Sequence, residues 1–80
     1  MLFRSTGWTT AIGECLAAGA RRLPRGADIA ALAEFILTTM EGGVMQARTH
    51  RDIAYFDRNI EQLRRHMALL DQAARQEAAA

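Results

Sequence analysis

The 80-residue sequence predicts an all-α fold in which one short helix precedes a long antiparallel helix pair. Apolar side chains recur at steps of three and four residues along three segments, which is the helical period. Pro24, the only proline, lies in a loop-like run that separates the first two segments, and an Arg-Asp turn separates the last two. No segment shows the alternating pattern of a β-strand. We therefore expect a single helical domain over residues 1–80.

The first predicted helix spans residues 6–20. Its apolar residues lie on one face, which predicts that this face packs against the rest of the domain. These residues are Trp8, Ile12, Cys15, Leu16 and Gly19. The following loop contains Arg21, Arg22 and Arg25. We interpret it as a solvated loop, and a phosphate clamp is the alternative.

The second predicted helix spans residues 28–49 and has Asp28 as its N-cap. It is apolar around most of its circumference, and its charges form one narrow stripe of Glu34, Glu41 and Arg48. A helix that is apolar nearly all round must be buried nearly all round. Two short neighbouring helices cannot surround it, so we expect a second subunit to cover the remainder.

Gly42 and Gly43 lie inside this second predicted helix. Each glycine costs about 1 kcal/mol relative to alanine in a helix interior. One interpretation is a hinge or a gap that faces a ligand. We favour the other interpretation, in which another helix passes so close that no side chain fits.

The third predicted helix spans residues 53–72 and follows Asp52 as its cap. One apolar stripe predicts packing in a helix bundle. A second stripe on its flank is half polar, and such flanks commonly meet a copy of themselves across a two-fold axis. Residues 73–80 are alanine-rich without a further apolar anchor, so we expect a frayed end.

These stripes divide the helical residues into a predicted core and a predicted dimer interface. The core set is Trp8, Ile12, Leu16, Ile36, Met40, Phe56, Ile60, Leu63 and Met67. The dimer-interface set is Leu32, Phe35, Thr39, Gly42, Gln46, Tyr55, Asn59, Gln62, His66 and Leu69. For His66, on its half-polar flank, we favour an interface hydrogen bond over a proton switch or a metal ligand.

A small apolar ligand is a further candidate partner. Trp8, Phe35, Met40 and Met45 are the side chains that we consider for a drug-sized apolar pocket. Methionine at helical spacing is also typical of plain core packing, which is the alternative interpretation.

Composition and spacing argue against an enzyme and against a metal or cofactor site. Cys15 is the only cysteine, so no intrachain disulfide can form. His50 and His66 lack a paired metal-ligand spacing. No nucleophile or second carboxylate converges with the charged stripe of the second predicted helix. We predict a protein without catalytic activity, cofactor or metal.

Charge and hydropathy exclude two further classes of partner. The net charge of +1 is too small for nucleic-acid binding by electrostatics alone. No apolar run approaches the roughly 18 residues that a membrane span needs, and we find no convincing secretory signal. We expect a cytoplasmic chain that binds neither nucleic acid nor a membrane.

Several runs of the chain resemble the C-terminal region of TetR-family transcriptional regulators. These runs are residues 31–37 (ALAEFIL), residues 40–48 (MEGGVMQAR) and residues 52–63 followed by Arg64 and Arg65. In that family a Leu-Ala-x-Phe helix, a Glu-Gly pair and an Ala-Arg precede a short Arg-Asp turn, and a last helix with a Leu-Arg-Arg-like sequence follows. The resemblance extends over residues 8–70.

The resemblance implies that the second and third helices pack against the same pair of a second subunit as a four-helix bundle. It also implies that the helical domain binds a small effector. We expect the dimerisation and effector-binding portion of a TetR-like repressor, truncated so that no helix-turn-helix lies within these residues. The alternative is a stand-alone helical module that binds a small ligand or captures full-length relatives.

Overall fold

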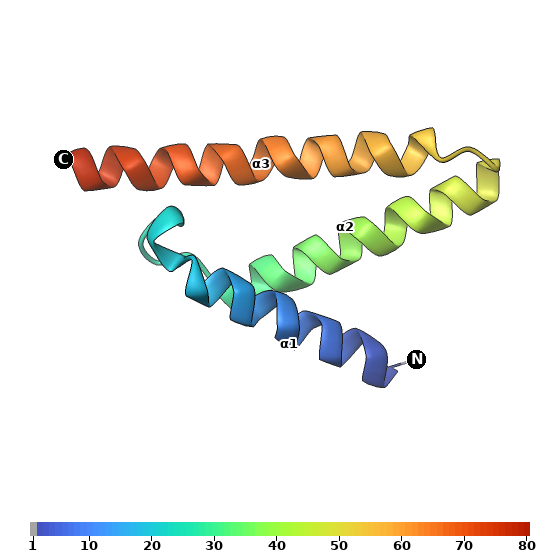
Figure 1. Ribbon diagram of the computed structural model, residues 1–80, viewed down its shortest axis with the longest axis horizontal. Coiled ribbons are helices and arrows are strands. Elements are labelled where there is room, and N and C mark those ends of the chain that lie inside the picture. Colours follow the sequence, from blue (N-terminus) through green and yellow to red (C-terminus); the bar gives the residue numbers. More distant parts are fainter. Residues whose placement is uncertain (1) are drawn as a thin grey trace.

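A computed structural model describes the backbone of residues 2–80 and the side chains of residues 7–80. Within residues 2–80 the chain forms three α-helices and one short 3-10 helix, and no strand (Figure 1). The elements are α1 (Leu2–Ala18), η1 (Ala20–Arg22), α2 (Ile29–His50) and α3 (Ala54–Ala79). The predicted all-α fold class is confirmed.

The helices form a single layer. α2 lies between α1 and α3, and the antiparallel α2–α3 pair opens away from the turn that joins the two helices (Figure 1). η1 contacts α3 near the open end of this pair. The molecule measures 47 × 27 × 14 Å, and its smallest dimension is close to the diameter of about 10–12 Å of one helix. Both broad faces of the layer are therefore without a covering element.

Local hydrogen bonds explain where α2 begins and ends. Asp28 is the N-cap of α2, as predicted: its Oδ1 accepts the backbone N–H of Ala31 at 3.0 Å. Arg51 ends α2 in the left-handed conformation, with φ 51° and ψ 44°. Asp52, the predicted cap of the third helix, is not its N-cap: that position is Ile53, which makes no side-chain cap bond, and Asp52 Oδ1 accepts the backbone N–H of Ala54 at 2.9 Å in the preceding turn. The turn between the two long helices is thus defined by its own residues.

The helix bounds differ from the prediction at both ends of the chain. α1 runs from Leu2 to Ala18 rather than over residues 6–20, and the chain beyond Gly19 forms the separate helix η1. α3 continues to Ala79, so the predicted frayed end at residues 73–80 is wrong. Ala74 is only 7% exposed, and Glu77 accepts the backbone N–H of Arg25 at 2.9 Å. Alanine favours the helix and is small enough for the loop after η1 to approach.

Part of the predicted core is wrong because the single layer encloses little. Among described hydrophobic residues, Ala33 and Ala74 are the buried ones. Trp8 is 62% exposed and Met40 is 38% exposed, since a single layer leaves parts of each helix without a covering element, and Cys15 is exposed as well. The remaining predicted core residues are half-buried: Ile12, Leu16, Ile36, Phe56, Ile60, Leu63 and Met67.

Candidate dimerisation surface

The predicted dimer-interface residues lie on adjacent parts of α2 and α3. We name this set the α2–α3 face and keep its members as the sequence predicted them. Its α2 residues are Leu32, Phe35, Thr39, Gly42 and Gln46, and its α3 residues are Tyr55, Asn59, Gln62, His66 and Leu69. The α2 residues and the α3 residues form one surface only if both stripes point to the same side of the helix pair. Two contacts between the helices bear on this orientation.

The first contact joins two aromatic rings. Phe35 of α2 and His66 of α3 meet edge to face, with ring centroids 5.2 Å apart and an interplanar angle of 63°. The second contact lies nearer the turn, where a Cβ on Gly43 would be 3.5 Å from the Cβ of Asn59. The stripes that the sequence assigned to separate helices are therefore neighbours and form one surface.

The ring contact also sets the register of this surface. The helices run antiparallel and each rises about 1.5 Å per residue. From the ring contact, Leu32 is level with Leu69 towards the open end of the pair. Gln46 is level with Tyr55 towards the turn. The α2–α3 face thus extends along most of α2.

The chain leaves much of this face uncovered. Phe35 is 46% exposed and Leu69 is 63% exposed. Gln46, Gln62 and His66 are exposed, and the remaining members are partly covered. Phe35 and Leu69 are thus the exposed large apolar members of this face, and other exposed large apolar residues of the described chain lie elsewhere: Trp8, Met40, Val44, Met45 and Ile53.

The two adjacent glycines have different surroundings. Gly43 is buried, and a Cβ built on it would lie 3.2 Å from Cδ1 of Phe56. The predicted close approach of another helix is confirmed there. A Cβ built on Gly42 meets nothing within 4 Å. The fold of one chain therefore explains Gly43 and gives no reason for glycine at position 42.

Polar members of the face near the turn already have partners within the chain. Asn59 Nδ2 donates a hydrogen bond of 2.7 Å to the backbone oxygen of Tyr55. The Tyr55 ring stacks on His50 at a centroid distance of 4.1 Å, and Cζ of Arg58 lies 4.6 Å from its centroid. The Asn59 amide can thus be covered while one of its N–H groups keeps a partner, which lowers the cost of burying it.

The predicted ligand residues do not converge within one chain. Phe35, Met40 and Met45 are spaced five residues apart on α2, so each is turned about 140° from the one before it. Trp8 and Met45 are 62% and 67% exposed. None of the pockets described between residues 7–80 is lined by any of these four side chains.

Among the described residues, no group of three or more His, Cys, Asp and Glu side chains is placed to hold a metal ion. In the same part of the chain, no helix is long and apolar enough to cross a membrane. Neither observation adds a second candidate site.

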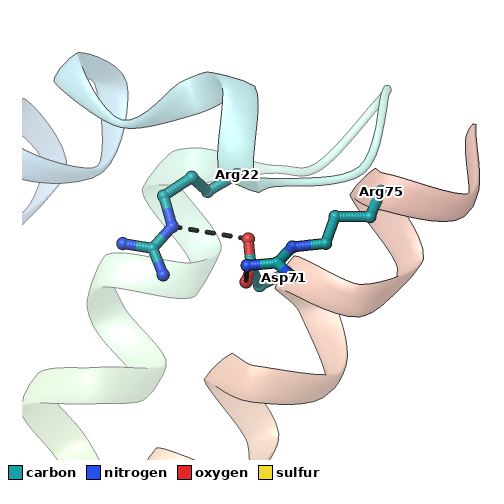
Figure 2. A network of polar contacts seen from close by, with 3 residues as sticks. All are labelled: Arg22, Asp71 and Arg75. Atoms are coloured by element: carbon teal, nitrogen blue, oxygen red, sulfur yellow. Dashed lines mark hydrogen bonds and ion pairs between the residues drawn. The ribbon is translucent and has the colours of Figure 1, made fainter. Parts of the chain in front are cut away.

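An ion-pair network that sequence reasoning missed joins η1 to α3. Asp71 Oδ1 lies 3.4 Å from Nε of Arg22, and its Oδ2 lies 3.2 Å from Nη2 of Arg75 (Figure 2). Arg22, considered above for a phosphate clamp, therefore has a structural partner. Two features of the sequence could have indicated this network: the acidic residue Asp71 lies beside the apolar stripe of α3, and an arginine-rich loop lies elsewhere in the chain.

No protein-family model, curated protein or solved structure matches this chain. The interpretation of the α2–α3 face therefore depends on its own residues and geometry. The TetR resemblance depends on the pattern within residues 8–70.

Proposed function

We propose that this chain is a dimerisation domain in which α2 and α3 pack against the same pair of a second copy. The main support is the single layer of helices, 14 Å thick, with the α2–α3 face uncovered. Helical domains are stable when apolar stripes are buried between at least two layers. A two-fold axis through the α2–α3 face supplies the second layer and gives a four-helix bundle.

The composition of the face suits a self-complementary interface. It contains apolar anchors in Leu32, Phe35 and Leu69, and it contains no carboxylate, lysine or arginine. Docking through these residues desolvates no ionic member of the set, and Arg58, whose Cζ lies 4.6 Å from the Tyr55 ring centroid, is the cation beside it. Aromatic residues at the centre of a patch are also typical of binding surfaces.

Gly42 supports the same proposal. A glycine inside a helix costs about 1 kcal/mol relative to alanine, and the single chain offers no contact that requires it. A partner helix that crosses α2 at this position would require the missing side chain. The pair Gly42 and Gly43 then serves two close approaches, one between subunits and one within the subunit.

The TetR resemblance supplies a biological setting for the dimer. In that setting the chain is the dimerisation portion of a TetR-like transcriptional repressor in the cytoplasm. The same face supports an alternative in which the chain captures a full-length relative as a mixed dimer. Binding of a small apolar effector has weaker support, because the chain does not bring its predicted ligand residues together.

Sedimentation of the purified protein at micromolar concentration tests the proposal. We expect a species of twice the 8.8 kDa mass of one chain. The variant Gly42→Leu should be a folded monomer, because its side chain has room in one chain and overpacks the interface.

Gly13→Leu is the matched control, since Gly13 also lies inside a helix with nothing within 4 Å of its built Cβ, but on α1. It should remain a dimer. A wild-type protein that sediments as a well-folded monomer would contradict the proposal.

A further inference from the structure

We infer that His66 makes dimerisation dependent on pH: the dimer requires a neutral imidazole, and protonation of His66 separates the subunits. This inference rests on the proposed function and concerns the regulation of the same surface. It depends on where His66 lies and on which charged groups surround it.

His66 lies in the α3 half of the α2–α3 face. Its ring contacts that of Phe35 at a centroid distance of 5.2 Å, and both residues are exposed in the single chain. A partner that covers Phe35 must therefore also cover His66. Imidazole is the side chain that ordinarily changes its charge between about pH 5 and pH 8.

Neither helix presents a carboxylate to His66. One helical turn away on α3 its neighbours are uncharged: Gln62, Leu63, Leu69 and Leu70. Glu61 is engaged with Arg65 at 3.3 Å, and Arg65 is turned about 100° from His66. Asp71 is turned about 140° from His66 and contacts Arg22 and Arg75.

The charged residues of α2 lie on other sides of that helix. Glu34, Glu41 and Arg48 are turned by about 100–140° from Phe35, the residue through which α2 reaches His66. A protonated imidazole would thus have no counter-ion from α2 or α3 at this surface.

The partner's surface offers no counter-ion either. In a two-fold dimer each subunit presents the same α2–α3 face, and that face has no acidic residue on any member. Protonation would therefore place an uncompensated positive charge in each half of the interface, which is strongly unfavourable.

The size of the effect follows from proton linkage. Each subunit takes up one proton on separation in acid, so dissociation of one dimer binds two. Because two protons are bound for each dimer that separates, we expect the dissociation constant to rise by tens of fold between about pH 7 and about pH 5.5, the range in which imidazole ordinarily changes its charge. Ordinary carboxylates and the chain's amino terminus change little in this window.

The test measures the dimer dissociation constant by sedimentation equilibrium at about pH 7 and about pH 5.5, for the wild type and for two variants. His66→Gln keeps a polar side chain without the titration. His50→Gln leaves His66 as the only histidine, since the chain has two. Far-ultraviolet circular dichroism checks that each sample stays helical.

We expect the constant to rise by tens of fold for the wild type and for His50→Gln, and to stay nearly constant for His66→Gln. The inference is overturned if His50→Gln dimerises equally well at both pH values, or if His66→Gln keeps the full response. Should His66→Gln fail to dimerise at all, His50→Gln still decides the question. A wild type that is monomeric at pH 7 refutes the proposed function itself, which is a different outcome.

Discussion

At the scale of single residues, Gly42 and Gly43 show how neighbouring positions on one helix serve different purposes. Gly43 faces Phe56 and Asn59 of α3, while Gly42 faces open space. Their side-chain directions differ by about 100°, so a helix that touches one does not cover the other. The sequence indicated a costly glycine pair, but it did not indicate which glycine serves which contact.

Gly43→Leu should lower the free energy of unfolding by about 1–3 kcal/mol, because a side chain there overpacks the α2–α3 contact. The steric reason is the 3.2 Å separation between the built Cβ and Cδ1 of Phe56. Urea denaturation followed by the helical circular dichroism signal, at one fixed protein concentration, measures the change.

Gly13→Ala is the control for helix propensity. Nothing lies within 4 Å of its built Cβ, so it should raise the free energy of unfolding by up to about 1 kcal/mol. A Gly43→Leu protein as stable as the wild type would contradict the close approach of α3.

At the scale of elements, α3 is longer than its apolar stripe predicts because its last turns hold the loop after η1. Asp71 pairs with Arg22, and Glu77 accepts the backbone N–H of Arg25 at 2.9 Å. Each contact joins residues about fifty positions apart in the sequence. Such polar contacts leave no periodic pattern, and for that reason the helix end was predicted too early.

Asp71→Asn should lower the free energy of unfolding by about 0.5–1 kcal/mol, since it removes the charge that holds Arg22 and Arg75. The loss stays modest because both arginine side chains are at least 75% exposed and remain solvated. Urea denaturation again measures the change.

Glu61→Gln is the matched control, because among residues 7–80 the ion-pair partner of Glu61 is Arg65, one turn along the same helix. Its effect should be about 0.3 kcal/mol. Equal losses for the two variants would mean that Asp71 does not hold η1 against α3.

Helix existence was predictable from the sequence and helix length was not. The bounds of α2 agree with the prediction to within a residue because Asp28 caps its start and a turn follows its end. The end of α3 lies instead where contacts between distant residues hold it, as between Glu77 and Arg25. The predicted burial of Trp8 is wrong for a related reason. The spacing of apolar residues predicts which face of a helix is apolar, but it does not predict whether another element covers that face.

At the scale of the whole molecule, the shape and the sequence lead to the same inference. α2 has more apolar circumference than two neighbours can cover, and the structure places those neighbours in one layer with it. The residues of the α2–α3 face were predictable because each helix has a regular period. The register of the two helices within that surface was not, because it depends on the contact between Phe35 and His66.

The most direct test of the central claim is a dilution series followed by the backbone amide signals in nuclear magnetic resonance spectra. If the α2–α3 face joins two copies, the amide signals of Phe35, Thr39 and His66 shift as the protein is diluted. Those of Glu34 and Glu41, on the charged stripe of α2, stay in place. Signals that are all unchanged in a protein that is monomeric throughout, or shifts confined to the side of Trp8 and Val44, would contradict the account.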